Sequence, residues 1–148
     1  MKKFEFRLEP VLRLKKQVED EKKRVVGELM AEINAQQQQA LEINQTIIQQ
    51  GNILKQKLAG GEVDTGWIAY YQRYVTDMRG EIARKIQTVT EIQKKLHLAR
   101  RALAEAAKET KMLEKLKEKQ YNQYMAFLDK LEKKELDEIG SQMYIRNM

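Results

Sequence analysis

A cluster of glycines in the middle of the chain most constrains how this sequence can fold. Three of the seven glycines lie within seven consecutive residues, and helical periodicity extends up to both sides of them. Gly60 or Gly61 can adopt the left-handed conformation that ends a helix. Asp64 and Thr65 offer side-chain oxygens that cap the first N–H groups of the next helix. We therefore predict a turn at about residues 59–66, from which two long helical arms leave.

The composition indicates what kind of fold these arms make. Of the 148 residues, 7% are aromatic, 34% are charged and one is proline. A compact globule needs apolar residues on several sides of each helix, whereas two helices that meet along one seam need only two apolar positions in seven. The sequence therefore predicts an all-α protein, a long antiparallel two-helix coiled-coil hairpin that forms a single domain over residues 1–148.

The first arm is expected at about residues 10–58. Pro10 is tolerated in a first helical turn, where its missing N–H would have no partner. A seven-residue spacing gives six apolar residues of seven at Leu12, Glu19, Val26, Ile33, Ala40, Ile47 and Leu54, with Leu8, Leu29 and Ile43 at companion positions. Gln36 and Gln50 also occupy companion positions, so the seam is expected to be weaker there.

The residues before this arm alternate in a strand-like manner, with Phe4, Phe6 and Leu8 separated by charged residues. Three residues of period two cannot make a sheet alone. We expect them to lie against the second arm as an extended or early helical lead-in.

The second arm, at about residues 67–140, carries the strongest regularity. One position holds Ile68, Val75, Ile82, Val89, Leu96 and Leu103, and the other holds Tyr71, Met78, Lys85, Ile92, Ala99, Ala106 and Leu113. Thr110, Lys117 and Gln120 then interrupt the pattern before Tyr124, Phe127 and Leu131 restore it. Pairing is therefore expected to be looser in this last part.

The two arms are too unequal to pair from end to end. At about 1.5 Å per residue the first spans roughly 73 Å and the second roughly 112 Å. Either residues 65–80 form a short helix folded beside the turn with a hinge at Gly80, or about 25 residues of the second helix extend beyond the first. We expect a mixture of the two.

Residues that carry chemistry are nearly absent. The chain has no cysteine and one histidine, and it lacks a phosphate-binding G-x-x-x-x-G-K-[ST] loop. His97 has no metal-ligating or nucleophilic neighbour in sequence, so we interpret it as a surface residue. We predict no enzyme activity, no catalytic residue, no metal site and no cofactor. No run of eighteen apolar residues occurs either, so we expect a soluble protein that is not exported.

The net charge of +6 is unevenly distributed. Residues 1–24 carry nine basic and five acidic side chains, residues 25–66 two and five, and residues 67–148 seventeen and twelve. In an antiparallel hairpin we expect the basic segments to meet at the end away from the turn, which suits an acidic partner. Nucleic acid is not favoured as that partner, because acidic residues are interspersed nearly everywhere among the basic ones.

Three segments resemble the flagellar type III export protein FliJ family. The F-x-L-E-x-V-L pattern of that family's opening is matched by Phe6, Leu8, Glu9, Val11 and Leu12. Its E-x-L-K-E-K segment is matched by Glu114, Leu116, Lys117, Glu118 and Lys119, and a later segment by Glu132, Lys133, Leu136, Asp137 and Glu138. Trp67-Ile68 followed by tyrosines is also similar. Gly140 departs from the family pattern, which leaves open how far the last helix runs.

The resemblance implies a structure similar to the central stalk subunit of rotary ATPases. It further implies a stalk that binds in the hexameric export ATPase, promotes its assembly and activity, and contacts the membrane export gate and export chaperones. Such a protein is cytoplasmic and peripherally associated with the inner membrane at the flagellar base. The alternatives are a structural coiled-coil scaffold protein and a stalk subunit of a related type III secretion or rotary ATPase.

Two sets of residues are predicted to contact partners. The ATPase contact is placed at the end formed by the termini, with Leu113, Lys115, Leu116, Lys117, Lys119, Glu135, Leu136, Asp137 and Glu138. Trp67, Tyr70 and Tyr74 form one stripe just after the turn. Either a short helix before Gly80 folds back and buries this stripe, or the stripe is exposed and forms the export-gate contact that the resemblance implies.

Overall fold

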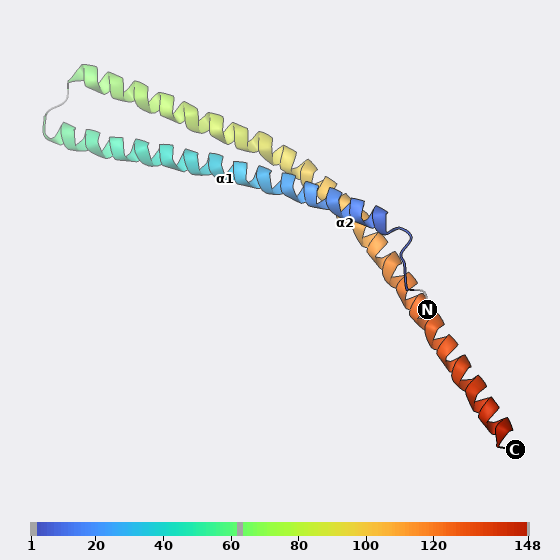
Figure 1. Ribbon diagram of the computed structural model, residues 1–148. Helices are drawn as coiled ribbons and strands as arrows, with labels where there is room; N and C mark the ends of the chain where they lie inside the picture. The colour runs from blue at the N-terminus through green and yellow to red at the C-terminus, as the bar shows by residue number, and fades with distance from the viewer. Residues whose placement is uncertain (1–2, 62–63, 148) are drawn as a thin grey trace. The chain divides into compact units, whose positions relative to one another are not determined.

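The computed structural model describes residues 3–61 and 64–147, which form two helices, α1 (Glu9–Ala59) and α2 (Thr65–Arg146) (Figure 1). No strand occurs in these two ranges. The helices pack against each other along an apolar seam. The predicted all-α helical hairpin is therefore confirmed.

Helix α1 begins directly after an extended lead-in. Residues 3–6 are not helical, and the Glu9 N–H donates a hydrogen bond to the Phe6 carbonyl at 3.0 Å. The Leu12 N–H donates to the Leu8 carbonyl at 2.9 Å. Pro10 lies in this first turn, where a missing N–H breaks no helical hydrogen bond.

Glycine ends α1 as the sequence predicts. The Gly60 N–H donates to the Gln56 carbonyl at 3.1 Å, and the Gly61 N–H donates to the Leu58 carbonyl at 3.3 Å. Gly61 has a φ of +70°, a left-handed conformation in which a side chain would be strained. Residues 62 and 63 of the predicted turn lie outside the described residues.

A single acidic side chain caps the start of α2. Asp64 Oδ1 accepts a hydrogen bond of 2.7 Å from the Trp67 N–H, and the Asp64 carbonyl accepts one of 3.3 Å from the Ile68 N–H. Of the two predicted caps, Asp64 therefore takes this role, and Thr65 is the first helical residue.

Helix α2 is continuous over 82 residues. The prediction of a separate short helix at residues 65–80 with a hinge at Gly80 is therefore wrong. One interior glycine costs a helix only about 1 kcal/mol, which the neighbouring seam residues outweigh. The helix also includes Gly140 and continues six residues beyond the predicted end at residue 140.

The chain divides into two compact units, each built from part of α1 and part of α2. We call Lys22–Leu103 the turn unit, and we call Met1–Glu21 together with Ala104–Met148 the terminal unit. The expectation of a single domain stays a prediction. The units are described separately below.

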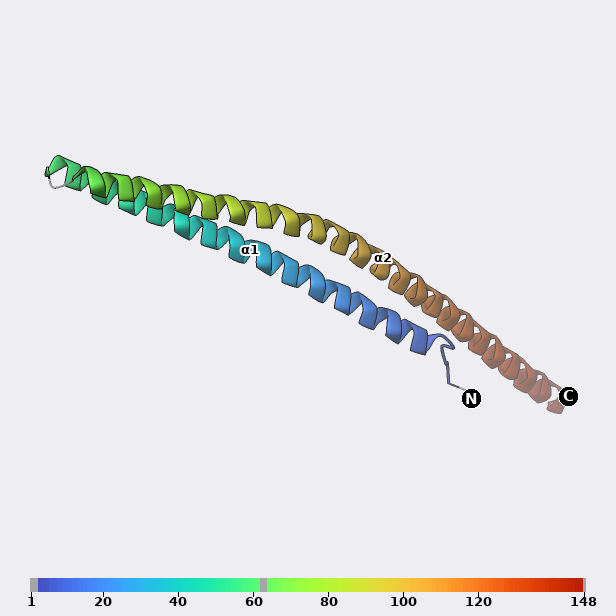
Figure 2. The ribbon, with the colours of Figure 1, turned by 90° about the horizontal axis from the view of Figure 1, so that it is seen from above.

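The turn unit has its core where the sequence places the seam, and Figure 2 shows its two helical segments side by side. Buried Ile33 of α1 packs with Val89, Ile92 and Leu96 of α2, and Val26 and Leu29 cover this cluster. The polar seam position Lys85 is satisfied across the helices, since its Nζ donates to Gln39 Oε1 at 2.8 Å. Every seam residue predicted in this unit is buried or half-buried.

The terminal unit is packed by the lead-in and the start of α1. Leu12 is 1% exposed and Phe6 is buried. The Phe4 ring lies 5.4 Å from the Tyr121 ring and 5.7 Å from the Tyr124 ring, measured between centroids. The prediction that the lead-in lies against the second arm is confirmed. Thr110, a predicted interruption, is buried, and its hydroxyl is satisfied by donating to the Ala106 carbonyl at 3.1 Å.

Candidate partner-binding surfaces

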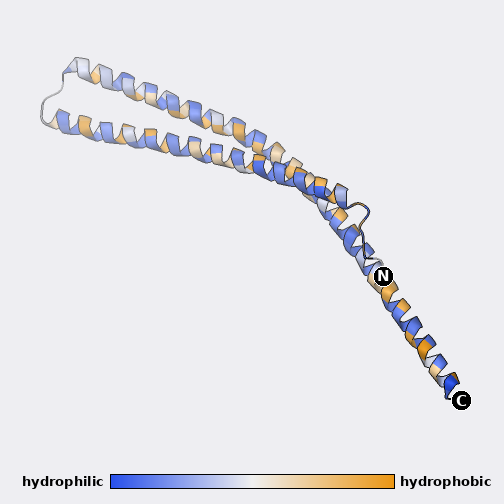
Figure 3. Ribbon diagram, in the orientation of Figure 1, coloured by the Kyte–Doolittle hydropathy of each residue, from blue (hydrophilic) through white to orange (hydrophobic). Residues whose placement is uncertain are grey.

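The last part of α2 has no covering element. Residues 129–147 are all exposed, although they include apolar side chains, and Figure 3 shows these apolar residues interspersed along the helix. The exposed apolar residues are Leu131, Leu136, Ile139, Met143, Tyr144 and Ile145. Such a stripe on a helix is typical of a surface that a partner covers.

One predicted part of the seam is absent here. Phe127 is 58% exposed and Leu131 is 39% exposed, so they do not restore the seam as predicted. The ring contacts of the lead-in are with Tyr121 and Tyr124, which precede this stretch. The seven-residue pattern continues in the sequence, but in the described part of the chain nothing packs on it.

The predicted ATPase-contact residues of the earlier segment fall into two groups. Leu113, Leu116 and Lys117 are half-buried inside the terminal unit. Lys115 and Lys119 are exposed, and no described residue forms an ion pair with either of them. Glu135, Leu136, Asp137 and Glu138 of the later segment are exposed as well. The structure thus separates residues that stabilise the fold from residues that are free to bind.

Lys117 is held by an acidic residue of the other helix. Its Nζ lies 2.8 Å from Glu9 Oε2. The hydrogen bond from Lys117 lowers the pKa of Glu9 below its ordinary value. Desolvation, the next largest effect, opposes this change, and the positive charges of Lys117, Arg13 and Lys16 add to the lowering. Two further pairs join the same helices, Lys15 with Glu109 at 2.8 Å and Lys16 with Glu114 at 3.6 Å.

The aromatic residues after the turn do not share one environment. Tyr70 is 70% exposed, whereas Trp67 and Tyr74 are half-buried. Trp67 stacks on Tyr71 with ring centroids 5.8 Å apart, and Lys57 Nζ lies 4.8 Å from the Trp67 centroid. No short helix folds back over them, because α2 is continuous. Trp67 is instead covered by its own neighbour and by a lysine of α1.

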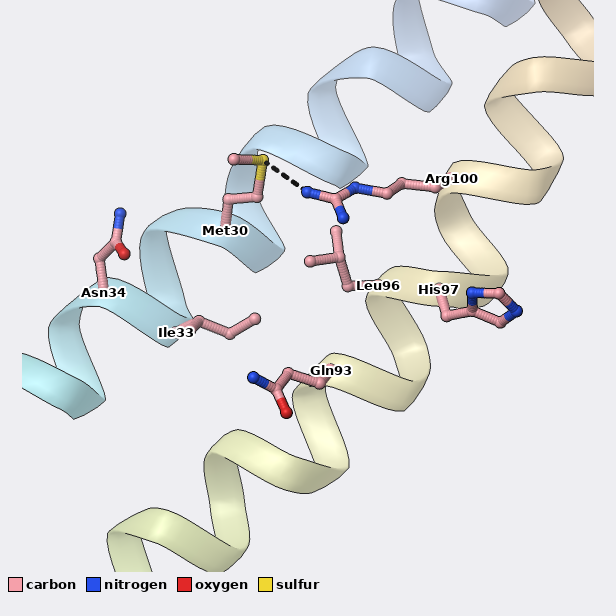
Figure 4. Close-up of a pocket in the computed structure, with 7 residues that line it drawn as sticks. All are labelled: Met30, Ile33, Asn34, Gln93, Leu96, His97 and Arg100. Carbon is pink, nitrogen blue, oxygen red and sulfur yellow. Dashed lines mark hydrogen bonds between the residues drawn. The ribbon is translucent and has the colours of Figure 1, made fainter.

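A groove on one side of the turn unit has no counterpart in the sequence predictions. It has a volume of about 410 Å³ and is lined by Met30, Ile33, Asn34, Gln93, Leu96, His97 and Arg100. Figure 4 shows Ile33 and Leu96 pointing toward one another, Arg100 reaching across to Met30, and His97 pointing away from α1. An Arg100 guanidinium nitrogen lies 3.7 Å from Met30 Sδ. We call this feature the basic groove.

The distribution of charge differs between the two units. The turn unit carries thirteen basic and eight acidic residues, and the terminal unit carries fifteen and fourteen. The excess of the turn unit lies in residues 22–24 and 79–103, away from the turn, and the terminal unit is nearly balanced. The prediction that the basic excess gathers at the end formed by the termini therefore stays a prediction. Residues 104–148 contain nine residues of each sign, so the basic excess of the second arm lies before them, in the turn unit.

Residues 3–61 and 64–147 lack two further kinds of feature. These residues contain no cluster of three or more histidine, cysteine, aspartate or glutamate side chains placed to hold a metal ion. Neither helix, over the same ranges, has a stretch apolar enough to span a membrane.

A family model described as flagellar FliJ protein matches residues 4–148. The chain belongs to the flagellar FliJ protein family. The FliJ family match includes both the opening pattern and the later E-x-L-K-E-K segment, which the structure joins through Glu9 and Lys117. Searches of curated proteins and of solved structures gave no match. Membership of the FliJ family implies a role in flagellar export, in a family of non-catalytic export apparatus components.

Proposed function

We propose that this protein is a coiled-coil stalk of the flagellar export apparatus, which binds in the hexameric export ATPase and promotes its assembly and activity. The observation that carries this proposal is the uncovered helix at residues 129–147. Apolar side chains there, such as Leu136 at 67% exposed, stay in water unless a partner covers them. A partner that closes around a helix, as a ring does, can bury such side chains on more than one side.

The proposal extends to two further partners. The exposed Tyr70 ring is an amphipathic anchor of the kind that is enriched at interface hot spots, so we assign it to the export gate together with Trp67 and Tyr74. Export chaperones complete the partners that the FliJ family suggests. With these contacts the protein acts in the cytoplasm, peripherally at the inner membrane of the flagellar base.

The experiment that tests the ATPase contact combines the purified chain with the export ATPase and measures ring assembly and ATP hydrolysis. Wild-type chain is expected to raise both. The variant Leu136→Asp places a charge in the uncovered stripe and should abolish the stimulation without unfolding the chain. Leu41→Asp is the matched control, since Leu41 is 57% exposed on α1 in the turn unit. Equal loss of stimulation by both variants, or by neither, contradicts the proposal.

A further inference from the structure

The basic groove of the turn unit has basic side chains without acidic partners. Arg100 lines the groove, and Lys94 and Arg101 lie near it on α2 without lining it. All three are exposed, and no carboxylate in residues 3–61 and 64–147 forms an ion pair with any of them. In the terminal unit, by contrast, Lys15, Lys16 and Lys117 each have an acidic partner on the other helix. The charges at the groove are therefore available to an external partner.

The side of α2 that carries the groove is free of acidic residues over several turns. Residues three, four or seven positions apart share a helix face, so Gln93, His97 and Arg100 lie on one face, with Lys94 and Arg101 beside them. Between residues 79 and 104 the acidic residues of α2, Glu81 and Glu91, fall outside this face.

The α1 side of the groove shows the same pattern. Met30 and Asn34 line the groove, and the acidic residues nearest to Met30 are Glu28 and Glu32. Each is two positions from Met30, a spacing that places it on a different face of the helix. The groove thus combines a floor formed by the edges of Ile33 and Leu96, which are 8% and 7% exposed, and the 43% exposed Met30 with a rim that carries the charge of Arg100 and no acidic residue.

A segment of complementary chemistry exists in the same chain. Residues 135–145, which we call the tail segment, contain three acidic residues, Glu135, Asp137 and Glu138, and no basic residue. Leu136, Ile139 and Met143 have helical spacing and are 67%, 53% and 60% exposed. The tail segment is thus an acidic amphipathic helix with an unpartnered apolar face.

We propose that the tail segment of one copy of this chain docks in the basic groove of a second copy. Its apolar stripe covers Met30, Ile33 and Leu96, and its carboxylates face Arg100, Arg101 and Lys94. The apolar floor favours this occupant over a nucleic acid, whose phosphates match the charges but not the apolar side chains. The contacts that residues 135–145 make in the groove bury less than about 1,200 Å² of surface in total. The association is therefore weak and reversible.

This arrangement joins two different surfaces, so each added copy leaves one groove and one tail segment unoccupied. It also withdraws Leu136, Asp137 and Glu138 from the ATPase contact proposed above. The inference does not rest on that contact, because its partner is a second copy of the chain.

The test is sedimentation equilibrium of the full chain from about 20 μM to 1 mM at low salt, a range chosen because interfaces of this size bind weakly. The weight-average mass should rise with concentration beyond that of a dimer, and 0.5 M salt should suppress the rise, since exposed charges are screened within about 3–10 Å at 0.1–1 M salt. A monomer at all concentrations overturns the proposal.

Charge reversal then tests the two surfaces. Arg100→Glu with Arg101→Glu should weaken association at least about tenfold, as close charge pairs at an interface allow. Asp137→Lys with Glu138→Lys should do the same, and the four changes together should restore association. Arg84→Glu with Lys95→Glu makes the same charge change away from the groove face and should behave as wild type.

A mixture of the groove variant and the tail variant provides the sharpest result. The intact tail segment of the first fits the intact groove of the second, and the reversed tail segment of the second fits the reversed groove of the first. The mixture should therefore assemble beyond a pair, although each variant alone associates only weakly. Undiminished association of the groove variant alone, or a mixture that associates no better than either variant alone, overturns the proposed docking. Because the groove residues are not among the proposed ATPase contacts, failure here leaves the ATPase result unaffected.

Discussion

Glu9 and Lys117 form an ion pair of 2.8 Å that joins the first turn of α1 to α2 in the terminal unit. Glu9 belongs to the opening pattern of the family and Lys117 to the E-x-L-K-E-K segment. Each pattern is composed of ordinary helix-forming residues. The ion pair joins the two patterns in the folded chain, beside the buried side chains of Phe6 and Leu12.

This ion pair predicts how stability changes in acid. Because the pKa of Glu9 is lowered in the folded state, its stabilising contribution is present above the ordinary pKa of 4.5 and is lost as the pH falls through the lowered pKa. Glu9→Gln should therefore lower the melting temperature near neutral pH, and the wild type and the variant should converge in acid. Circular dichroism melts at pH 2–7 measure this. Glu118 is exposed and forms no ion pair with the described residues of α1, so Glu118→Gln should follow the wild type. A pH-independent gap between Glu9→Gln and the wild type would contradict the ion-pair interpretation.

A substitution at Leu96 tests which side of α2 faces α1. It is 7% exposed and packs with Ile33 and Ile92, so Leu96→Asp places an unpaired charge in the core and should cost about 3 kcal/mol or more in the free energy of unfolding. Leu98→Asp is the matched control, because Leu98 is 65% exposed, and it should change stability by less than about 0.5 kcal/mol. Urea unfolding followed by circular dichroism gives both values. If Leu96→Asp and Leu98→Asp lower the free energy of unfolding by similar amounts, the side of α2 that carries Leu96 does not face α1.

Gly51 tests how closely the helices approach near the turn. A Cβ added at Gly51 would lie 3.3 Å from Tyr71 Oη, whereas one added at Gly27 would meet nothing within 4 Å. Gly27→Ala should therefore stabilise the chain by about 0.5–1 kcal/mol through helix propensity, and Gly51→Ala should gain less. Adding Tyr71→Phe to Gly51→Ala removes the crowding oxygen and should recover part of the difference. Equal gains at Gly27 and Gly51 in urea unfolding would refute the close approach.

Trp67 and Tyr70 should separate stability from binding. Trp67→Ala removes a stacked ring and a cation–π contact, so we expect a loss of about 1–3 kcal/mol. Tyr70→Ala should change stability by less than about 0.5 kcal/mol, because the ring is exposed, and should weaken binding to the cytoplasmic part of the export gate. Thermal melts and a binding titration distinguish the two effects. Unchanged gate affinity in Tyr70→Ala would remove Tyr70 from the proposed contact.

Lys115 and Lys119 test electrostatic steering toward the ATPase. Reversing both to glutamate should reduce stimulation of ATP hydrolysis and make the remaining stimulation less sensitive to salt. Lys117 is left unchanged, since its reversal would place a second negative charge beside Glu9 and disturb the fold. Arg84→Glu with Lys95→Glu is again the control of equal charge. If the control and the Lys115 and Lys119 variant lose stimulation equally, net charge rather than this site is responsible.

The fold was predictable because a seven-residue pattern directly encodes which side of a helix is buried. Leu12, Ile33, Val89 and Leu96 were all placed in the seam from spacing alone, and all are buried. The length of α2 was not predictable from Gly80, since the cost of one glycine has to be weighed against packing on both sides of it. The seven-residue pattern also could not show that Phe127 is exposed. Whether a residue of α2 is covered there depends on how far the lead-in before α1 extends along α2.

The candidate surfaces were predictable only in part. Counting charges along three segments concealed the equal numbers of acidic and basic residues in 104–148, so the counts did not show that the basic excess of the second arm lies before residue 104. The sequence did not predict the basic groove, because its existence depends on which side of α1 lies beside Arg100. The contact between Arg100 and Met30 shows which side that is. The helix faces without acidic residues on α1 and on α2 can each be recognised in the sequence, but the sequence does not show that they lie next to each other.

The register of the hairpin also determines the order in which its contacts can form. Contacting residues are ten positions apart for Lys57 and Trp67, 46 for Gln39 and Lys85, 70 for Met30 and Arg100, and 94 for Lys15 and Glu109. Once an inner contact exists, the next one closes only a short additional loop, so folding proceeds as a zipper that starts at the turn. During synthesis the start of α1 is made first and is paired last, and it remains without a partner until the ribosome has made residues 109–124.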